Sequence, residues 1–168
     1  EIPVVVSMGS VAASGGYWIA AEADEIWALP TTITGSIGAF SAFPTIEGVI
    51  DYIGVKVDGL GTTPLAGAAS LNRGLSPEMS NIVQALSYGA YEDFIELVAT
   101  GRNMSDADVR EIAEGIVWIG ADAAEIGLVD QLGGLQEAAE SAAALAGVDQ
   151  WRTGRTQVPP SFESILLE

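Results

Sequence analysis

The chain has 168 residues, with 23 acidic and 6 basic side chains, a formal net charge of −17, and neither histidine nor cysteine. Without imidazole it cannot carry a Ser-His-Asp triad, and without imidazole and thiol ligands it lacks the usual donors of zinc, haem and iron–sulfur sites. The negative charge disfavours nucleic acid as a partner, and no apolar run approaches the roughly 20 residues that span a bilayer. We expect one folded domain with no cofactor and no metal.

The first predicted strand covers residues 3–7, where three consecutive valines are typical of a strand buried on both faces of a parallel sheet. Such a strand needs neighbours on both sides, so we expect part of the sheet to lie upstream of this chain. Small residues over 8–16 predict a tight crossing into a helix that begins near Tyr17. A short strand is predicted over 25–29, and a loop over 31–38, where hydroxyl side chains alternate with glycine.

A helix over 45–53 and a strand over 55–57 come next. Ser76, followed by Pro77, then predicts the start of the longest helix, which we expect to end at Gly101. Its apolar residues recur at spacings of three and four and predict one apolar face, made of Met79, Ile82, Val83, Leu86, Ala90, Tyr91, Phe94, Leu97 and Val98.

Ser105 resembles the first residue of a capping box and predicts a second helix that runs to Glu114. The remaining predicted elements are a strand over 116–118, a helix from Ala121, a strand over 128–129 and an alanine-rich helix over 135–146. Strands that alternate with helices predict an α/β fold with a largely parallel sheet. We expect the domain to cover residues 1–148, and an extended acidic tail to cover 149–168.

Ser14 is the first candidate for chemistry. It lies where a buried strand has ended and a helix is about to begin, and its neighbours are alanines and glycines. A hydroxyl there lies in the positive field of a helix N-terminus, and the free N–H of Gly15 can stabilise an oxyanion. On position alone, the commoner role of such a serine is that of a helix N-cap.

Several motifs occur in one order along the chain. They are Met8-Gly9-Ser10-Val11-Ala12-Ala13-Ser14-Gly15-Gly16-Tyr17, Thr34-Gly35-Ser36-Ile37-Gly38, Gly115-Ile116-Val117-Trp118-Ile119-Gly120, Gly127-Leu128-Val129-Asp130 and Leu132-Gly133-Gly134. Together they resemble the signal peptide peptidase A family, also called protease IV, over nearly the whole chain. Of these motifs only the first is specific by itself, and we expect Asp130 to be structural.

This resemblance implies a Clp-protease/crotonase-like fold and a serine endopeptidase that uses a Ser-Lys dyad. Ser14 is then the nucleophile, Gly15 supplies an oxyanion N–H, and Ser36 orients the lysine. Lysine acts as a general base at neutral pH only where burial lowers its pKa, and serine attack then gives an acyl-enzyme.

The implied substrates are cleaved signal peptides and other apolar peptides. Next to Ser36, an extended peptide can add as a strand along residues 35–42. The candidate substrate-binding residues are therefore Ile37, Ala39 and Phe40, although these residues are as readily explained as parts of a core strand.

The expected lysine is absent. Shorter members of the family place it after the strand at 55–57, near Leu65 of this chain, whereas long members have two related halves with the serine in the C-terminal half and the lysine in the N-terminal half. This chain resembles such a C-terminal half, so we expect it to be inactive alone. Lys56, the only lysine, is a weaker candidate base because a strand lysine is usually solvated.

The resemblance also implies partners and a location. We expect the lysine to come from the N-terminal half of the same protein or from a neighbouring subunit, and we expect a homo-oligomer. The implied location is the bacterial inner membrane, facing the periplasm, with an anchor outside this chain.

Two other functions stay open. A crotonase-type acyl-CoA hydratase or isomerase shares the fold, but such enzymes often use glutamates, and no acidic residue follows Ser14 until Glu22. A non-catalytic assembly module would explain the missing base, and the long apolar-faced helix would then serve a subunit interface.

Overall fold

Two small sheets with mainly parallel pairing form the centre of the protein. In the computed structural model, which describes residues 2–63 and 65–154, β1 (Val5–Ser7) pairs in parallel with β3 (Glu25–Ala28), and β3 pairs in parallel with β6 (Gln131–Leu132). In the second sheet, β2 (Val11–Ala13) lies parallel to β4 (Ile33–Gly35), and β4 lies antiparallel to β5 (Val117–Ile119). The predicted α/β fold with a largely parallel sheet is confirmed, with β5 as the antiparallel exception.

Six helices are found in the part of the chain that the structure describes. They are α1 (Gly15–Trp18), α2 (Glu47–Tyr52), α3 (Pro77–Arg102), α4 (Asp106–Ile112), α5 (Gly120–Glu125) and α6 (Leu135–Leu145). The predicted starts of α3 and α4 are confirmed: the Ser76 hydroxyl accepts a hydrogen bond from the Met79 N–H at 3.2 Å, and the Ser105 hydroxyl accepts one from the Asp108 N–H at 3.1 Å.

Some of the strand predictions are wrong. β2 and β4 occupy stretches that the sequence predicts as a crossing and a loop, because these three-residue strands form by pairing with each other and carry no long apolar pattern. Residues 55–57 are not a strand, and residues 128–129 form the turn after α5, where the Leu128 N–H donates to the Ala123 carbonyl at 2.8 Å. Among the described residues β1 pairs on one side only and is half-buried, so the expected burial on both faces is not found.

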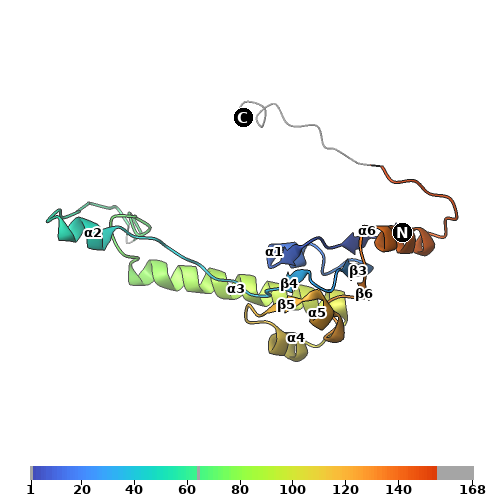
Figure 1. Ribbon diagram of the computed structural model, residues 1–168. Helices are drawn as coiled ribbons and strands as arrows, with labels where there is room; N and C mark the ends of the chain where they lie inside the picture. The colour runs from blue at the N-terminus through green and yellow to red at the C-terminus, as the bar shows by residue number, and fades with distance from the viewer. Residues whose placement is uncertain (1, 64, 155–168) are drawn as a thin grey trace.

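Residues 39–89 form an arm that projects away from the sheets (Figure 1). The predicted apolar face of α3 is buried only near the helix C-terminus, around Phe94 and Val98, whereas Ile82 and Leu86 are 40% and 69% exposed. The arm also exposes the large apolar side chains of Phe40, Val49, Tyr52, Ile53, Leu60 and Tyr88. Three of the nine residues of the predicted face, Ile82, Leu86 and Ala90, are therefore exposed in the described part of the chain.

The core lies where α1 and the end of α3 meet the sheets. Tyr17 of α1 is fully buried and its hydroxyl donates to the Leu128 carbonyl at 2.8 Å; burial raises the pKa of this phenol. Gly101 does not end α3, as its sequence position suggested, because the helix continues to Arg102 and ends at Asn103, which has φ 51°. Instead, a Cβ at Gly101 would overlap the Ala21 backbone, 2.7 Å from its carbonyl carbon.

The predicted tail over 149–168 lies largely outside the described residues. Residues 149–154 have no helix or strand. The domain boundary at residue 148 therefore stays a prediction.

Candidate active site

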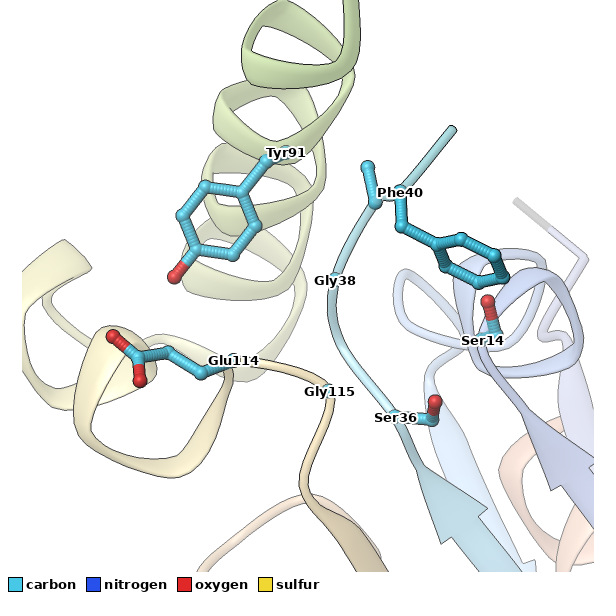
Figure 2. A pocket seen from close by; sticks show the side chains of 8 residues that line it. Ser14, Ser36, Gly38, Phe40, Tyr91, Glu114 and Gly115 are labelled. Atoms are coloured by element: carbon cyan, nitrogen blue, oxygen red, sulfur yellow. The ribbon is translucent and has the colours of Figure 1, made fainter. Parts of the chain in front are cut away.

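The register of β2 and β4 brings Ser14 and Ser36 to the same level of the second sheet. Ala13 is paired with Gly35, so Ser14 and Ser36 are the next residues of the two strands. The Ser14 N–H continues the pairing by donating to the Gly35 carbonyl at 2.8 Å. Both serines line a pocket of about 360 Å³ (Figure 2). Two motifs that are separate in the sequence thus form one site.

Ser14 occupies a strained strand-to-helix turn between β2 and α1. Its backbone has φ 53° and ψ −119°, a conformation that is uncommon for a residue with a Cβ and costs on the order of 1–3 kcal/mol. Four described non-glycine residues have positive φ, and three of them line this pocket: Ser14, Ser36 and Glu114. Such strain gathers at functional sites, and a sharp strand-to-helix turn also presents the nucleophile of α/β-hydrolases.

The Ser14 hydroxyl does not cap α1. It makes no capping hydrogen bond, in contrast to the hydroxyls of Ser76 and Ser105, which both accept one from the first turn of their helices. The N-cap role considered for Ser14 is therefore wrong, and its side chain is exposed to the pocket.

Gly15 follows with a free N–H. Among the described residues no acceptor is found for this N–H, and the space where a Gly15 side chain would lie is open. α1 has only four residues, so the field of a helix dipole is weak here and the N–H itself is the relevant donor. Gly15 itself is not among the residues that line the pocket.

The three candidate substrate-binding residues differ in position. Ala39 and Phe40 line the pocket, and Phe40 is 90% exposed, with its ring beside Ser14 in Figure 2. Ile37, in contrast, is fully buried in the core and does not line the pocket. Ser36 and Gly38, on either side of it, line the pocket, so the chain turns Ile37 away from the pocket and into the core.

Tyr91, Glu114 and Gly115 also line the pocket, and sequence reasoning did not find them. The Gly115 N–H donates to the Ile37 carbonyl at 2.9 Å, which brings the turn before β5 against the segment after β4. A Cβ on Gly38 would lie 3.1 Å from the Gly115 nitrogen, so this approach favours glycine. Gly115 belonged to a motif already noted, whereas Tyr91 was hidden within an apolar pattern.

No basic side chain lines this pocket among the residues that the structure describes. Lys56 lies on the arm, where its side chain is 79% exposed and pairs with Asp51 at 2.7 Å, so it is not the base of this site in the chain as described. Leu65, where the family's lysine was expected, also lies on the arm and is 44% exposed.

Asp130 has structural contacts. One of its carboxylate oxygens accepts from the Ile26 N–H at 2.7 Å, and the other pairs with the nearly buried Arg102. Over residues 2–63 and 65–154, no group of acidic side chains is arranged to hold a metal ion.

Comparison with known proteins gives one consistent result. Residues 1–149 match the model of peptidase family S49. The chain is 45% identical over 167 residues to Protease 4 of Salmonella typhi, covering 99% of this chain and 27% of that relative. It is 36% identical over 141 residues to an Enterococcus faecium protein named for signal peptide peptidase SppA, covering 84% of this chain and 41% of that relative. The chain thus spans less than half the length of either relative.

A solved structure of an enoyl-CoA hydratase/isomerase family protein from Hyphomonas neptunium is also similar. The TM-score is 0.42 with 15% sequence identity, and the match covers 86% of this chain and 38% of that chain. This similarity says nothing about activity.

Proposed function

This chain belongs to peptidase family S49, and from that membership we propose that it carries the nucleophile of a serine endopeptidase whose general base lies on polypeptide outside these 168 residues. One observation carries the proposal. Ser14 stands at a helix start in a strained conformation, yet its hydroxyl caps nothing and opens into a pocket beside Ser36. A serine that precedes a helix normally stabilises it through a capping hydrogen bond, and Ser14 makes no such bond to offset its backbone strain.

The proposed reaction begins when the Ser14 hydroxyl attacks the scissile carbonyl of a bound peptide and passes its proton to a neutral lysine amine. The carbonyl oxygen becomes an oxyanion, which the Gly15 N–H stabilises. Collapse of this intermediate breaks the C–N bond, the lysine returns the proton to the leaving amine, and an acyl-enzyme remains. Water, deprotonated by the same lysine, then hydrolyses the ester.

Ser36 is proposed to hold the lysine in place. It lies level with Ser14 across the β2–β4 pairing, and its N–H donates to the Ile116 carbonyl at 2.8 Å, which fixes its backbone. An amine that approaches the Ser14 hydroxyl therefore meets a second hydroxyl. This hydrogen bond orients the lysine and does not take part in bond breaking.

The proposed source of the lysine is the N-terminal half of the same protein or a neighbouring subunit. The described pocket has no basic lining, and the chain spans 27% of its Salmonella relative. The exposed apolar side chains of the arm support a second protein surface packed against it, and we include a homo-oligomer in the proposal. The chain alone is expected to be inactive.

The proposed substrates are apolar peptides, including cleaved signal peptides. Residues 39–45 have no helix or strand and run beside α3 (Figure 1), where the Ser41 hydroxyl lies 2.7 Å from the Ser87 hydroxyl. No backbone hydrogen bond of these residues is found within the described ranges. An extended peptide can therefore add along this segment through main-chain hydrogen bonds, with Ala39 and Phe40 as apolar contacts. The name of the Enterococcus faecium relative supports this substrate class.

We propose a location at the bacterial inner membrane, facing the periplasm, with an anchor outside this chain. None of the described helices is long and apolar enough to cross a bilayer. Membrane fractionation of the full-length protein, with and without the polypeptide that precedes this chain, tests the location.

The test of the peptidase is active-site labelling of the full-length protein with a serine-directed fluorophosphonate, together with cleavage of a quenched apolar peptide. Ser14→Ala is expected to abolish both signals without unfolding the protein. Ser10→Ala is the matched control, because Ser10 is exposed in the same motif but does not line the pocket. Labelling that persists in Ser14→Ala would remove this residue from the mechanism, and enoyl-CoA turnover without labelling would favour the hydratase.

A further inference from the structure

The pocket beside Ser14 has a second end, and that end is acidic. Tyr91 of α3 and Glu114, which lies between α4 and β5, line the same pocket as Ser14 and Ser36. Figure 2 shows the two serine side chains on one side of the segment at Gly38, and the side chains of Tyr91 and Glu114 on the other. The Tyr91 hydroxyl points toward the turn that carries Glu114.

Gly38 keeps the two ends connected. It has no side chain to divide the pocket, and its close approach to Gly115, 3.1 Å from the position of a Cβ to the Gly115 nitrogen, favours glycine at this position. A peptide bound across Gly38 can thus place one residue near Ser14 and another residue near Glu114.

The Glu114 carboxylate has no basic partner among the described residues, whose ion pairs are Lys56–Asp51, Arg102–Asp130 and Arg110–Glu92. Arg110 lies 5.7 Å from the centre of the Tyr91 ring, but Glu92 engages it through two hydrogen bonds of 2.9 and 2.6 Å. The hydrogen bonds from Arg110 lower the pKa of Glu92, so both side chains stay charged and Arg110 is already paired with Glu92. Glu114 is exposed and lines the pocket, so its negative charge is not neutralised by any described neighbouring side chain.

The backbone fixes where this carboxylate lies. Glu114 has φ 56° and Gly115 has φ 75°, so two successive residues take the left-handed conformation that glycine prefers. The Gly115 N–H anchors the turn to the Ile37 carbonyl at 2.9 Å. Glu114 and Gly115 both line the pocket, so this turn is fixed as part of the pocket wall.

We propose that Glu114 and the Tyr91 hydroxyl form an acidic subsite that binds a cationic group of the peptide substrate, either a lysine or arginine side chain or a free α-amino group. The inference rests on the proposed function, because it assigns part of the substrate of the same site. A peptide that is apolar with a positive charge close by has the composition of a signal peptide, which joins a charged segment to an apolar one.

Peptide binding to the full-length protein tests the subsite without requiring cleavage. A Ser14→Ala background is used, and binding of fluorescent apolar peptides is measured by anisotropy. One series carries a single lysine at successive positions, a second carries glutamine at the same positions, and a third compares free with acetylated N-termini. The lysine series tests a side-chain cation and the third series tests the α-amine.

We expect roughly threefold to tenfold tighter binding of a cationic peptide at one position, or of the free N-terminus, and a smaller difference at high salt. Glu114→Gln should remove this preference, because glutamine has the same shape without the charge. Glu111→Gln, on the exposed face of α4 and outside the pocket, should keep it. Tyr91→Phe should reduce it partly, and serves as the second variant should Glu114→Gln fail to fold.

Equal binding of all peptides, or a preference that survives in Glu114→Gln, would overturn the subsite. A different result would contradict the proposed peptidase function: the protein with Ser14 intact would bind cationic peptides with the same preference but cleave none of them. The two proposals can therefore fail separately.

Discussion

Two glycines of α3 allow one substitution to be tested with opposite expected signs. Gly89→Ala places a Cβ where no atom lies within 4 Å, whereas Gly101→Ala places one against the Ala21 backbone, 2.7 Å from the carbonyl carbon and 3.1 Å from the Glu22 Cα. Both changes replace glycine by the best helix former inside the same helix, and this gain is about 1 kcal/mol at each position.

At Gly101 the steric term decides the result. The overlapping atoms belong to backbone that follows α1, so they cannot rotate away, and helix or loop must shift. Overpacking of this kind costs about 1–3 kcal/mol, and more where no relaxation is available. We therefore expect Gly101→Ala to be destabilised by about 1–2 kcal/mol and Gly89→Ala to be stabilised by up to about 1 kcal/mol.

Equilibrium unfolding in urea measures both effects. The midpoints should move in opposite directions at an unchanged slope, since neither substitution alters the surface exposed on unfolding. A Gly101→Ala midpoint equal to or above that of Gly89→Ala would refute the close packing of α3 on the Ala21 backbone.

Three further predictions concern the site and its support. Ser36→Ala should lower kcat of the full-length peptidase without abolishing it and should change the pH–rate profile, because the lysine loses an orienting hydrogen bond; an unchanged profile would count against this role. Gly38→Ala should reduce cleavage more than stability, because its Cβ would lie 3.1 Å from the Gly115 nitrogen and displace the pocket wall; parallel measurement of kcat/KM and thermal midpoint checks this, and full activity would contradict it. Tyr17→Phe should lower the free energy of unfolding by about 1–3 kcal/mol, since the buried Leu128 carbonyl loses its 2.8 Å hydrogen bond; wild-type stability in urea would show that the bond contributes nothing.

The helix starts and the candidate nucleophile Ser14 could be identified from local sequence. Ser76 and Ser105 signal helix starts through their own hydroxyls, and a capping bond involves residues only three apart. The motif around Ser14 was specific enough to indicate the family, which the match over residues 1–149 confirms.

The short strands could not be predicted in the same way. β2 and β4 each have three residues, and what makes them strands is their pairing with each other, which no pattern within either segment reports. Conversely, a strand was expected at 128–129 because both residues are apolar. The structure buries these two residues without pairing them in a strand.

The sequence by itself determined the α/β class, the long helix, the serine at the strand-to-helix turn and the absence of any histidine or second lysine. Only the tertiary structure decided that Ser14 caps nothing, that Ile37 points into the core, and that Glu114 reaches the pocket. The physical reason is range: caps and periodic faces depend on residues a few positions apart, whereas a pocket wall is assembled from segments that meet only after the sheets have paired.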